Sequence, residues 1–288
     1  MQLKLELLQY TGSFKPRGAF NKMLGLSDQE RSVGVVAVSG GNHGMAVAEV
    51  AGQLGITSVV VMPDYAPPAS VARARLAGAN VRLTPGMPEA FRLLDELVAA
   101  GLTAVHPFDD PAVVAGQGTV GLEFVRDATD LTDVLVSIGG GGLIAGVATA
   151  FRSLAPEVRI WGVETEGATA MFEALIEAKP VSTTPTSIVS TLSAPHVSAL
   201  TLQHAVELVE EVIVVSDADA VRGSLTMAER AKVWAEPAAG CLIPAAQRVI
   251  RRVGPDVRLG LIVCGGNVTI DAMNDWIARF GIDSRTMP

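Results

Sequence analysis

The stretch VLVSIGGGGLIAGVATAFRSL, residues 134–154, decides how the rest of the sequence is interpreted. An apolar run at 134–138 leads into four consecutive glycines and then into a pattern typical of a buried helix at 143–154. The 18 residues from 134 to 151 carry no charge, and 18 is the shortest length expected of a membrane-spanning helix. Four glycines inside such a helix would cost about 1 kcal/mol each. We therefore predict a buried strand, a tight turn and a helix instead of a membrane span.

The same order of apolar strand, turn and helix recurs along the chain. Four further apolar runs are predicted to be buried strands: 33–38, 58–62, 159–163 and 257–263. Helical patterns follow three of them, at 45–54, 69–77 and 270–280. Buried strands that alternate with helices indicate βαβ crossovers, which place strands parallel and helices on both faces of a sheet. The sequence therefore predicts the α/β class with mostly parallel, twisted sheets.

Composition excludes several classes of protein. A chain of 288 residues buries roughly 75% of its unfolded surface, so it needs no disulfides to be stable. Thirty acidic and 22 basic residues give a net charge of −8 without any basic block, which argues against nucleic-acid binding. Cys241 and Cys264 form no CxxC pair, so a disulfide scaffold or zinc ribbon is excluded. Lys4 and Glu6 interrupt the N-terminal apolar stretch, so it is no signal peptide, and we expect a cytoplasmic protein with no membrane partner.

Three glycine-rich turns, at 39–44, 139–142 and 264–267, each follow a predicted strand and precede a helix. Ligands of open parallel sheets lie beyond the carboxyl ends of the strands, so we expect these turns to converge on one crevice. The four glycines at 139–142 expose backbone N–H groups before a helix N-terminus, which favours a bound phosphate. The spacing matches neither the P-loop nor the dinucleotide fingerprint. A tight turn without a ligand is the alternative that the sequence leaves open.

One of the five lysines stands apart from the others. Lys15 lies in QYTGSFKPRGA (9–19), and the following Pro16 suits the first turn of a helix. A lysine near a phosphate-holding loop can be desolvated and form a Schiff base with an aldehyde cofactor. The other four are expected to be solvated surface groups: Lys4, Lys22, Lys179 and Lys232.

The segment LKLELLQYTGSFKPRGAFN (3–21) resembles the lysine segment of fold-type II pyridoxal-phosphate enzymes, in the threonine/serine dehydratase and serine racemase branch. Five further motifs of that branch follow in family order: SGGNHG (39–44), HPFDDPAVVAGQGTVGLE (106–123), GGGGL (139–143), EPAAG (236–240) and CGGN (264–267). The resemblance implies a tryptophan synthase β-like fold and a homodimer. It also implies a large cofactor domain, 1–33 plus 111–288, into which a small substrate-loop domain, 34–110, is inserted.

The resemblance also implies roles for individual residues. Lys15 would form the Schiff base with pyridoxal 5′-phosphate and then remove the α-proton of the substrate. Phe14 would pack against the cofactor ring, Asn42 would bind its 3′-oxygen, and Cys264 would face its pyridine nitrogen. The phosphate is assigned to Gly139, Gly140, Gly141, Gly142 and Leu143. The loop that receives the substrate carboxylate contains Ser39, Gly41, Asn42 and His43; for His43, a partly buried loop histidine is the equal alternative.

The expected reaction depends on position 40. A racemase needs a second acid or base on the face of the α-carbon opposite Lys15, and serine racemase has a serine where this chain has Gly40. Elimination needs only one base, and Phe108 also follows the dehydratase pattern. We therefore expect deamination of L-threonine or L-serine, both small amino-acid substrates, to a 2-oxo acid and ammonia. Serine racemase, hydroxyaspartate dehydratase and a non-catalytic cofactor-binding protein are the alternatives.

The resemblance has departures as well. Metal-dependent relatives bind a cation through a glutamate and an aspartate six residues later. Glu164 matches the first, but Ala170 stands at the second, so no metal site is expected. Relatives carry a longer N-terminal segment, and its lack here favours the non-catalytic alternative if that segment is essential. The chain leaves no room for a C-terminal regulatory domain, so feedback by isoleucine is not expected.

Overall fold

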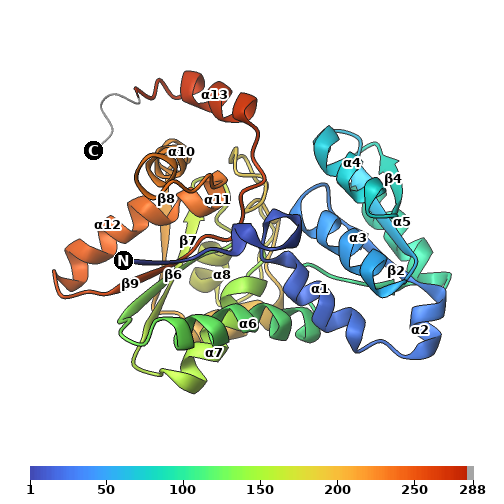
Figure 1. The fold of residues 1–288 in the computed structure, drawn as a ribbon, viewed down its shortest axis with the longest axis horizontal. Helices are drawn as coiled ribbons and strands as arrows, with labels where there is room; N and C mark the ends of the chain where they lie inside the picture. The colour runs from blue at the N-terminus through green and yellow to red at the C-terminus, as the bar shows by residue number, and fades with distance from the viewer. Residues whose placement is uncertain (284–288) are drawn as a thin grey trace. The chain divides into compact units, whose positions relative to one another are not determined.

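The computed structural model describes residues 1–283, and these form two compact units. The large unit comprises Met1–Leu8 and the chain from Gly118 onward, and the small unit comprises Gln9–Gln117. Helix α6 (Pro111–Asp127) contains the boundary between them (Figure 1). Among the described residues, none of the helices has both the length and the apolarity needed to cross a bilayer.

The large unit is built on a parallel sheet of five strands in the order β1-β9-β6-β7-β8. The strands are β1 (Gln2–Lys4), β6 (Asp133–Ser137), β7 (Arg159–Thr165), β8 (Glu211–Val215) and β9 (Leu259–Ile262). The helices after α6 are α7 (Gly142–Leu154), α8 (Ala170–Glu177), α9 (Ala199–Leu208), α10 (Asp217–Thr226), α11 (Pro237–Gly240), α12 (Leu242–Val253) and α13 (Ile270–Arg279). Every residue of β6 is buried, as expected for a central strand with helices on both faces.

The small unit contains a second parallel sheet, in the order β4-β3-β2-β5. Its strands are β2 (Val35–Val38), β3 (Ser58–Pro63), β4 (Asn80–Thr84) and β5 (Thr103–Ala104). Its helices before α6 are α1 (Lys15–Leu24), α2 (Asp28–Val33), α3 (Asn42–Leu54), α4 (Pro68–Leu76) and α5 (Met87–Ala99). Alternate residues of β2 belong to different core clusters, one shared with α1 and α3 and the other with α5. Since successive side chains of a strand point to opposite faces, these helices cover both faces of the sheet.

The predicted α/β class with parallel sheets is confirmed. Each strand and helix that the sequence indicated is present, with ends shifted by a few residues. Contacts assign residues 9–33 and 111–117 to the small unit, because α1 shares a core cluster with β2 and α3. The domain boundaries implied by the resemblance, at 33/34 and 110/111, differ from this grouping and stay a prediction.

Candidate functional site

Lys15 is the first residue of α1, where Pro16 occupies the first turn as expected. Before it the chain turns sharply, with φ of 64° at Thr11 and 75° at Gly12. The Lys15 side chain is half-buried, and its Nζ donates a hydrogen bond to the carbonyl of Pro107 at 3.4 Å. The same Nζ lies 4.9 Å from the centre of the Phe14 ring. The amine is therefore held beside an apolar wall instead of extending into water.

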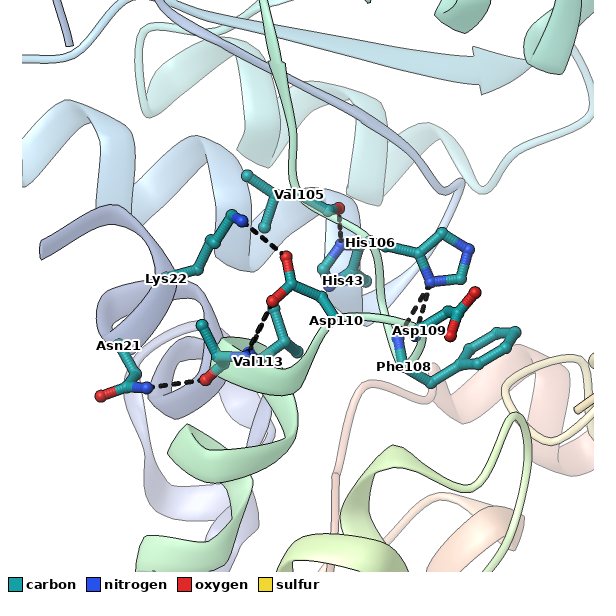
Figure 2. A network of polar contacts seen from close by, with 10 residues as sticks. Asn21, Lys22, His43, Val105, His106, Phe108, Asp109, Asp110 and Val113 are labelled. Atoms are coloured by element: carbon teal, nitrogen blue, oxygen red, sulfur yellow. Dashed lines mark hydrogen bonds and ion pairs between the residues drawn. The ribbon is translucent and has the colours of Figure 1, made fainter. Parts of the chain in front are cut away.

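The segment 105–110, which carries Pro107, is fixed by hydrogen bonds on both sides (Figure 2). The Val105 carbonyl lies 2.7 Å from His43 Nε2. His106 Nδ1 accepts the backbone N–H groups of Phe108 at 3.3 Å and Asp109 at 2.7 Å. Asp110 precedes α6 and caps its start, because its Oδ1 accepts the N–H of Ala112 at 2.8 Å. A carbonyl in so constrained a turn gives the Lys15 amine a defined position.

Two lysines differ from the expectation of solvated surface groups. Lys22 forms an ion pair with Asp110 at 2.8 Å, and only 24% of its side chain is exposed (Figure 2). Lys4 pairs with Glu123 at 2.8 Å and with Asp127 at 3.1 Å. The expectation was wrong for both, because their carboxylate partners lie about 90 residues or more away in the sequence.

The SGGNHG turn connects β2 to α3 in the small unit. Asn42 begins α3, and Gly41 at the N-cap offers no side-chain cap to the first amides of the helix. Ser39 Oγ accepts the N–H of Gly41 at 3.2 Å, which closes the turn. A Cβ at position 44 would lie 2.3 Å from the Ser39 carbonyl, so only glycine fits at Gly44. The backbone at the start of α3 is thus compact and electropositive, as carboxylate binding requires.

His43 is only 3% exposed, and burial, helped by Lys15, lowers its pKa to about 3. The imidazole is therefore neutral at pH 7. Because Nε2 contacts the carbonyl of Val105, this nitrogen carries the proton and Nδ1 is an acceptor. Nδ1 is buried without a partner among residues 1–283. His43 therefore offers no positive charge to the substrate carboxylate. Binding of that carboxylate by the backbone N–H groups of the turn stays a prediction.

The glycine turn Gly139–Gly142 connects β6 to α7 in the large unit. Gly141 is the N-cap of α7 with φ of 90°, a left-handed conformation that favours glycine. A Cβ at this position would lie 2.8 Å from Met171 Cε. No side chain at the N-cap satisfies the first N–H groups of α7. A cradle of bare amides at a helix start is suited to a phosphate group.

Cys264 follows β9, the strand beside β6, and is 4% exposed. Its sulfur accepts a hydrogen bond from Ser137 Oγ at 3.4 Å, so the thiol lies near the strand end that leads into the glycine turn. Sequence reasoning missed Ser137. The available signal was its place as the last residue of β6, because neighbouring parallel strands end at the same edge.

The EPAAG and CGGN motifs are also brought together. Glu236 is buried, and its carboxylate accepts the Thr191 hydroxyl and the N–H of Asn267, each at 3.1 Å. A Cβ at position 265 would lie 3.0 Å from that carboxylate, so any side chain there would require Glu236 to shift. Thr191 belongs to a stretch to which sequence reasoning assigned no role.

The residues of each unit fit the expected cofactor. The small unit supplies a half-buried amine and a buried, unpartnered imidazole acceptor at Nδ1 of His43. The large unit supplies the glycine cradle for a phosphate and a buried thiol for a ring nitrogen. The roles of individual residues toward the cofactor stay predictions.

Comparisons with known proteins agree with this chemistry. Residues 2–265 match the family model described as pyridoxal-phosphate dependent enzyme. The L-threonine ammonia-lyase of Thermotoga maritima is 38% identical over 97% of this chain and 70% of its own length. The phenylserine dehydratase of Ralstonia pickettii is 39% identical over 93% of this chain and 82% of its own length.

Solved structures give the same result. Threonine deaminase isoform 2 from Solanum lycopersicum superposes with a TM-score of 0.92 at 31% identity, covering 98% of this chain and 78% of its own. Maize serine racemase has a TM-score of 0.88 at 32% identity, covering 95% and 85%. The chain therefore belongs to the family of pyridoxal-phosphate-dependent enzymes, in the branch of the threonine dehydratases and serine racemases.

Proposed function

We propose that this enzyme releases ammonia from L-threonine or L-serine and leaves a 2-oxo acid. The observation that carries the proposal is the half-buried amine of Lys15, held on the Pro107 carbonyl beside Phe14. Relatives named as ammonia-lyases and dehydratases support it, since they are 38–39% identical over more than nine tenths of the chain. A base placed in this way removes a proton from carbon without competition from bulk water.

Bound pyridoxal phosphate supplies an electron-withdrawing ring that acidifies the α C–H bond of a linked amino acid. Lys15 anchors the cofactor and takes up the α-proton at Nζ, and Phe14 excludes water from the ring. The Gly139–Leu143 turn would hold the phosphate through its N–H groups, Asn42 would bind the 3′-oxygen of the ring, and Cys264 would face its pyridine nitrogen. The N–H groups of the Ser39–His43 turn bind the substrate carboxylate.

Elimination is favoured over racemisation by the surroundings of Gly40. Glycine has no side chain to act as a second acid or base. A Cβ at this position would lie 2.9 Å from the Cβ of Ala66, so the turn is also closed to a larger residue. With a proton donor on one face only, the β-hydroxyl leaves more readily than the α-proton returns to the opposite face.

The deciding experiment is an assay of the purified enzyme with L-threonine, L-serine, hydroxyaspartate and phenylserine. We expect 2-oxo acid and ammonia in equal amounts from threonine or serine, with the visible spectrum of the cofactor changing on substrate addition. Release of D-serine without keto acid would support the racemase alternative instead. Cofactor binding with no turnover of any of the four would support the non-catalytic alternative.

Two finer expectations belong to the proposal as well. A homodimer is expected from the resemblance, and light scattering of the purified protein tests it. A cytoplasmic location is tested by cell fractionation. A monomer or a membrane-associated fraction would contradict these expectations without affecting the proposed reaction.

A further inference from the structure

Glu164 lies in β7 and is 1% exposed, and its carboxylate is hydrogen-bonded by backbone N–H groups. Its Oε1 accepts the backbone N–H of Met171 at 2.8 Å, and its Oε2 accepts that of Phe172 at 2.9 Å. Both N–H groups belong to the first turn of α8. The two carboxylate oxygens therefore satisfy two amides that a helix leaves without partners inside itself.

The residue that normally caps such a helix is engaged elsewhere. Thr169 is the N-cap of α8, but it makes no side-chain cap hydrogen bond. Its hydroxyl donates instead to Glu173 Oε1 at 2.6 Å. Glu164 thus supplies the cap from a neighbouring strand, and the positive end of the helix dipole stabilises its charge. Burial, with a smaller contribution from Glu173, still raises the pKa of Glu164 to about 7.

A divalent cation does not fit the same place. Calcium takes 6–8 oxygen ligands from carboxylates, carbonyls and water, and magnesium takes an octahedron of waters with one or two carboxylates. Ala170 supplies no carboxylate, and both oxygens of Glu164 already accept N–H groups. Residues 1–283 contain no group of three acidic, histidine or cysteine side chains that could hold a metal. The positive end of α8 also disfavours a cation.

The start of α8 contacts the glycine turn through Met171. This side chain is fully buried, and a Cβ at Gly141 would lie 2.8 Å from its Cε. Moving the first turn of α8 would therefore move the atom that packs against the N-cap of α7. The contact connects Glu164 to the cradle assigned to the phosphate.

We propose that Glu164 is a positioning residue that holds the start of α8, and through Met171 the glycine turn, without a bound cation. The part that concerns phosphate rests on the proposed function. The part that concerns capping and cations does not, so the two are tested separately.

The first test uses the cofactor-free protein after treatment with EDTA. Its melting temperature is measured with and without millimolar Mg²⁺, Ca²⁺ or Mn²⁺. We expect a change below about 1 °C, because a ligand that does not bind the native state adds no stability. A rise of several degrees that is lost in Glu164→Gln would identify Glu164 as a cation ligand and overturn the proposal. This arm needs no cofactor to bind.

The second test compares Glu164→Gln with Glu177→Gln, at an exposed glutamate in the last turn of α8. Glutamine keeps the shape of the side chain but offers only one acceptor oxygen, so one amide loses its partner. We expect the melting temperature to fall by about 4 °C in Glu164→Gln and to change little in Glu177→Gln. Equal melting temperatures for Glu164→Gln and the unsubstituted protein would show that the carboxylate is not a cap.

The third test separates the phosphate turn from general stability. Affinities for pyridoxal phosphate and for pyridoxal, which lacks the phosphate, are measured by fluorescence in Glu164→Gln and Met171→Leu. The leucine keeps the buried volume but removes Met171 Cε, which together with Thr201 Cβ would lie nearest a Cβ at Gly141. We expect both variants to lose about tenfold in affinity for the phosphorylated form only. Equal losses for both ligands, or none, would overturn the link through Met171.

Discussion

The two glycine turns that open α3 and α7 look alike in sequence but restrict substitution for different reasons. Both follow a parallel strand, and neither N-cap residue caps its helix with a side chain. Gly141 has φ of 90°, so any other residue there is strained. Gly40 does not have a positive φ, and its constraint is steric instead. A Cβ at position 40 would lie 2.9 Å from the Cβ of Ala66. A neighbour can be changed to admit a side chain at Gly40, whereas a backbone conformation cannot.

The two turns also differ in whether they carry side chains. The α3 turn places Asn42 and His43 inward, and both are buried. The α7 turn consists of backbone alone over four residues. The proposed function therefore predicts that the small unit supplies the reacting side chains and that the glycine turn of the large unit binds phosphate through backbone N–H groups.

The largest expected effect is that of Lys15→Ala. Ammonia release should fall about 10³-fold or more, because the base and the covalent anchor are both removed. Borohydride should no longer fix the cofactor to the protein, yet the glycine turn should still bind it reversibly. Lys179→Ala, at an exposed lysine, is the matched control. A retained reducible adduct would mean that a different lysine is the anchor.

Gly141→Ala tests whether the turn before α7 binds the cofactor. The left-handed backbone and the close approach of Met171 together should destabilise the large unit by about 2–4 kcal/mol. Cofactor affinity should fall at least tenfold. Gly254→Ala is the control, because Gly254 has φ of 114° but no atom within 4 Å of its Cβ position. Equal effects on cofactor affinity in both variants would contradict a role of the turn in binding.

Gly40→Ser combined with Ala66→Gly tests whether the Ala66 contact is what excludes a side chain from position 40. Alone, the serine should destabilise the protein by about 1–3 kcal/mol through overpacking. The double variant should recover most of this loss in a urea titration and release measurable D-serine from L-serine on a chiral column. Recovered stability with unchanged stereochemistry would show that position 40 does not reach the second face of the substrate.

The smallest effect concerns acid stability and His43. Its pKa of about 3 in the folded state lies below the ordinary value of 6.5, so the unfolded chain binds more protons between these values. The contribution is fully present above pH 6.5 and is lost as the pH falls toward 3, by about 1 kcal/mol between pH 7 and 5.5. His43→Gln keeps a donor for Val105 and should flatten this slope in urea titrations. An unchanged slope would mean that the imidazole is not buried in neutral form.

The strands and turns were predictable wherever one short segment carried the whole signal. The run 134–138 followed by four glycines specifies a buried strand and a turn, and β6 and α7 are found there. Strands β4, β5 and β8 were not predicted. The residues of β4 are mostly exposed and β5 has two residues, so neither gives a strong apolar run, whereas the apolar run VIVV (212–215) of β8 was overlooked. Pairing with a neighbouring strand makes them strands.

Within the candidate site, the motifs predict which residues carry chemistry, and these roles stay predictions, but sequence did not predict the protonation states or hydrogen-bond partners of these residues. Lys15 was identified by its motif and by the proline after it. The hydrogen-bond partner of His43, the Val105 carbonyl, is 62 residues away, and Ser137, which donates to Cys264, is 127 residues away. Such pairs leave no local pattern.

The sequence by itself determined the α/β class, the order of strand, glycine turn and helix, and the family motifs. These depend on neighbours within about ten residues, and spacing and composition record them directly. Only the tertiary structure decided that Glu164 caps α8, that Ala66 closes the space at Gly40 and that Lys22 pairs with Asp110. Burial, close approach and hydrogen bonding depend on which distant segments come into contact, and that is fixed only when the sheets and helices pack.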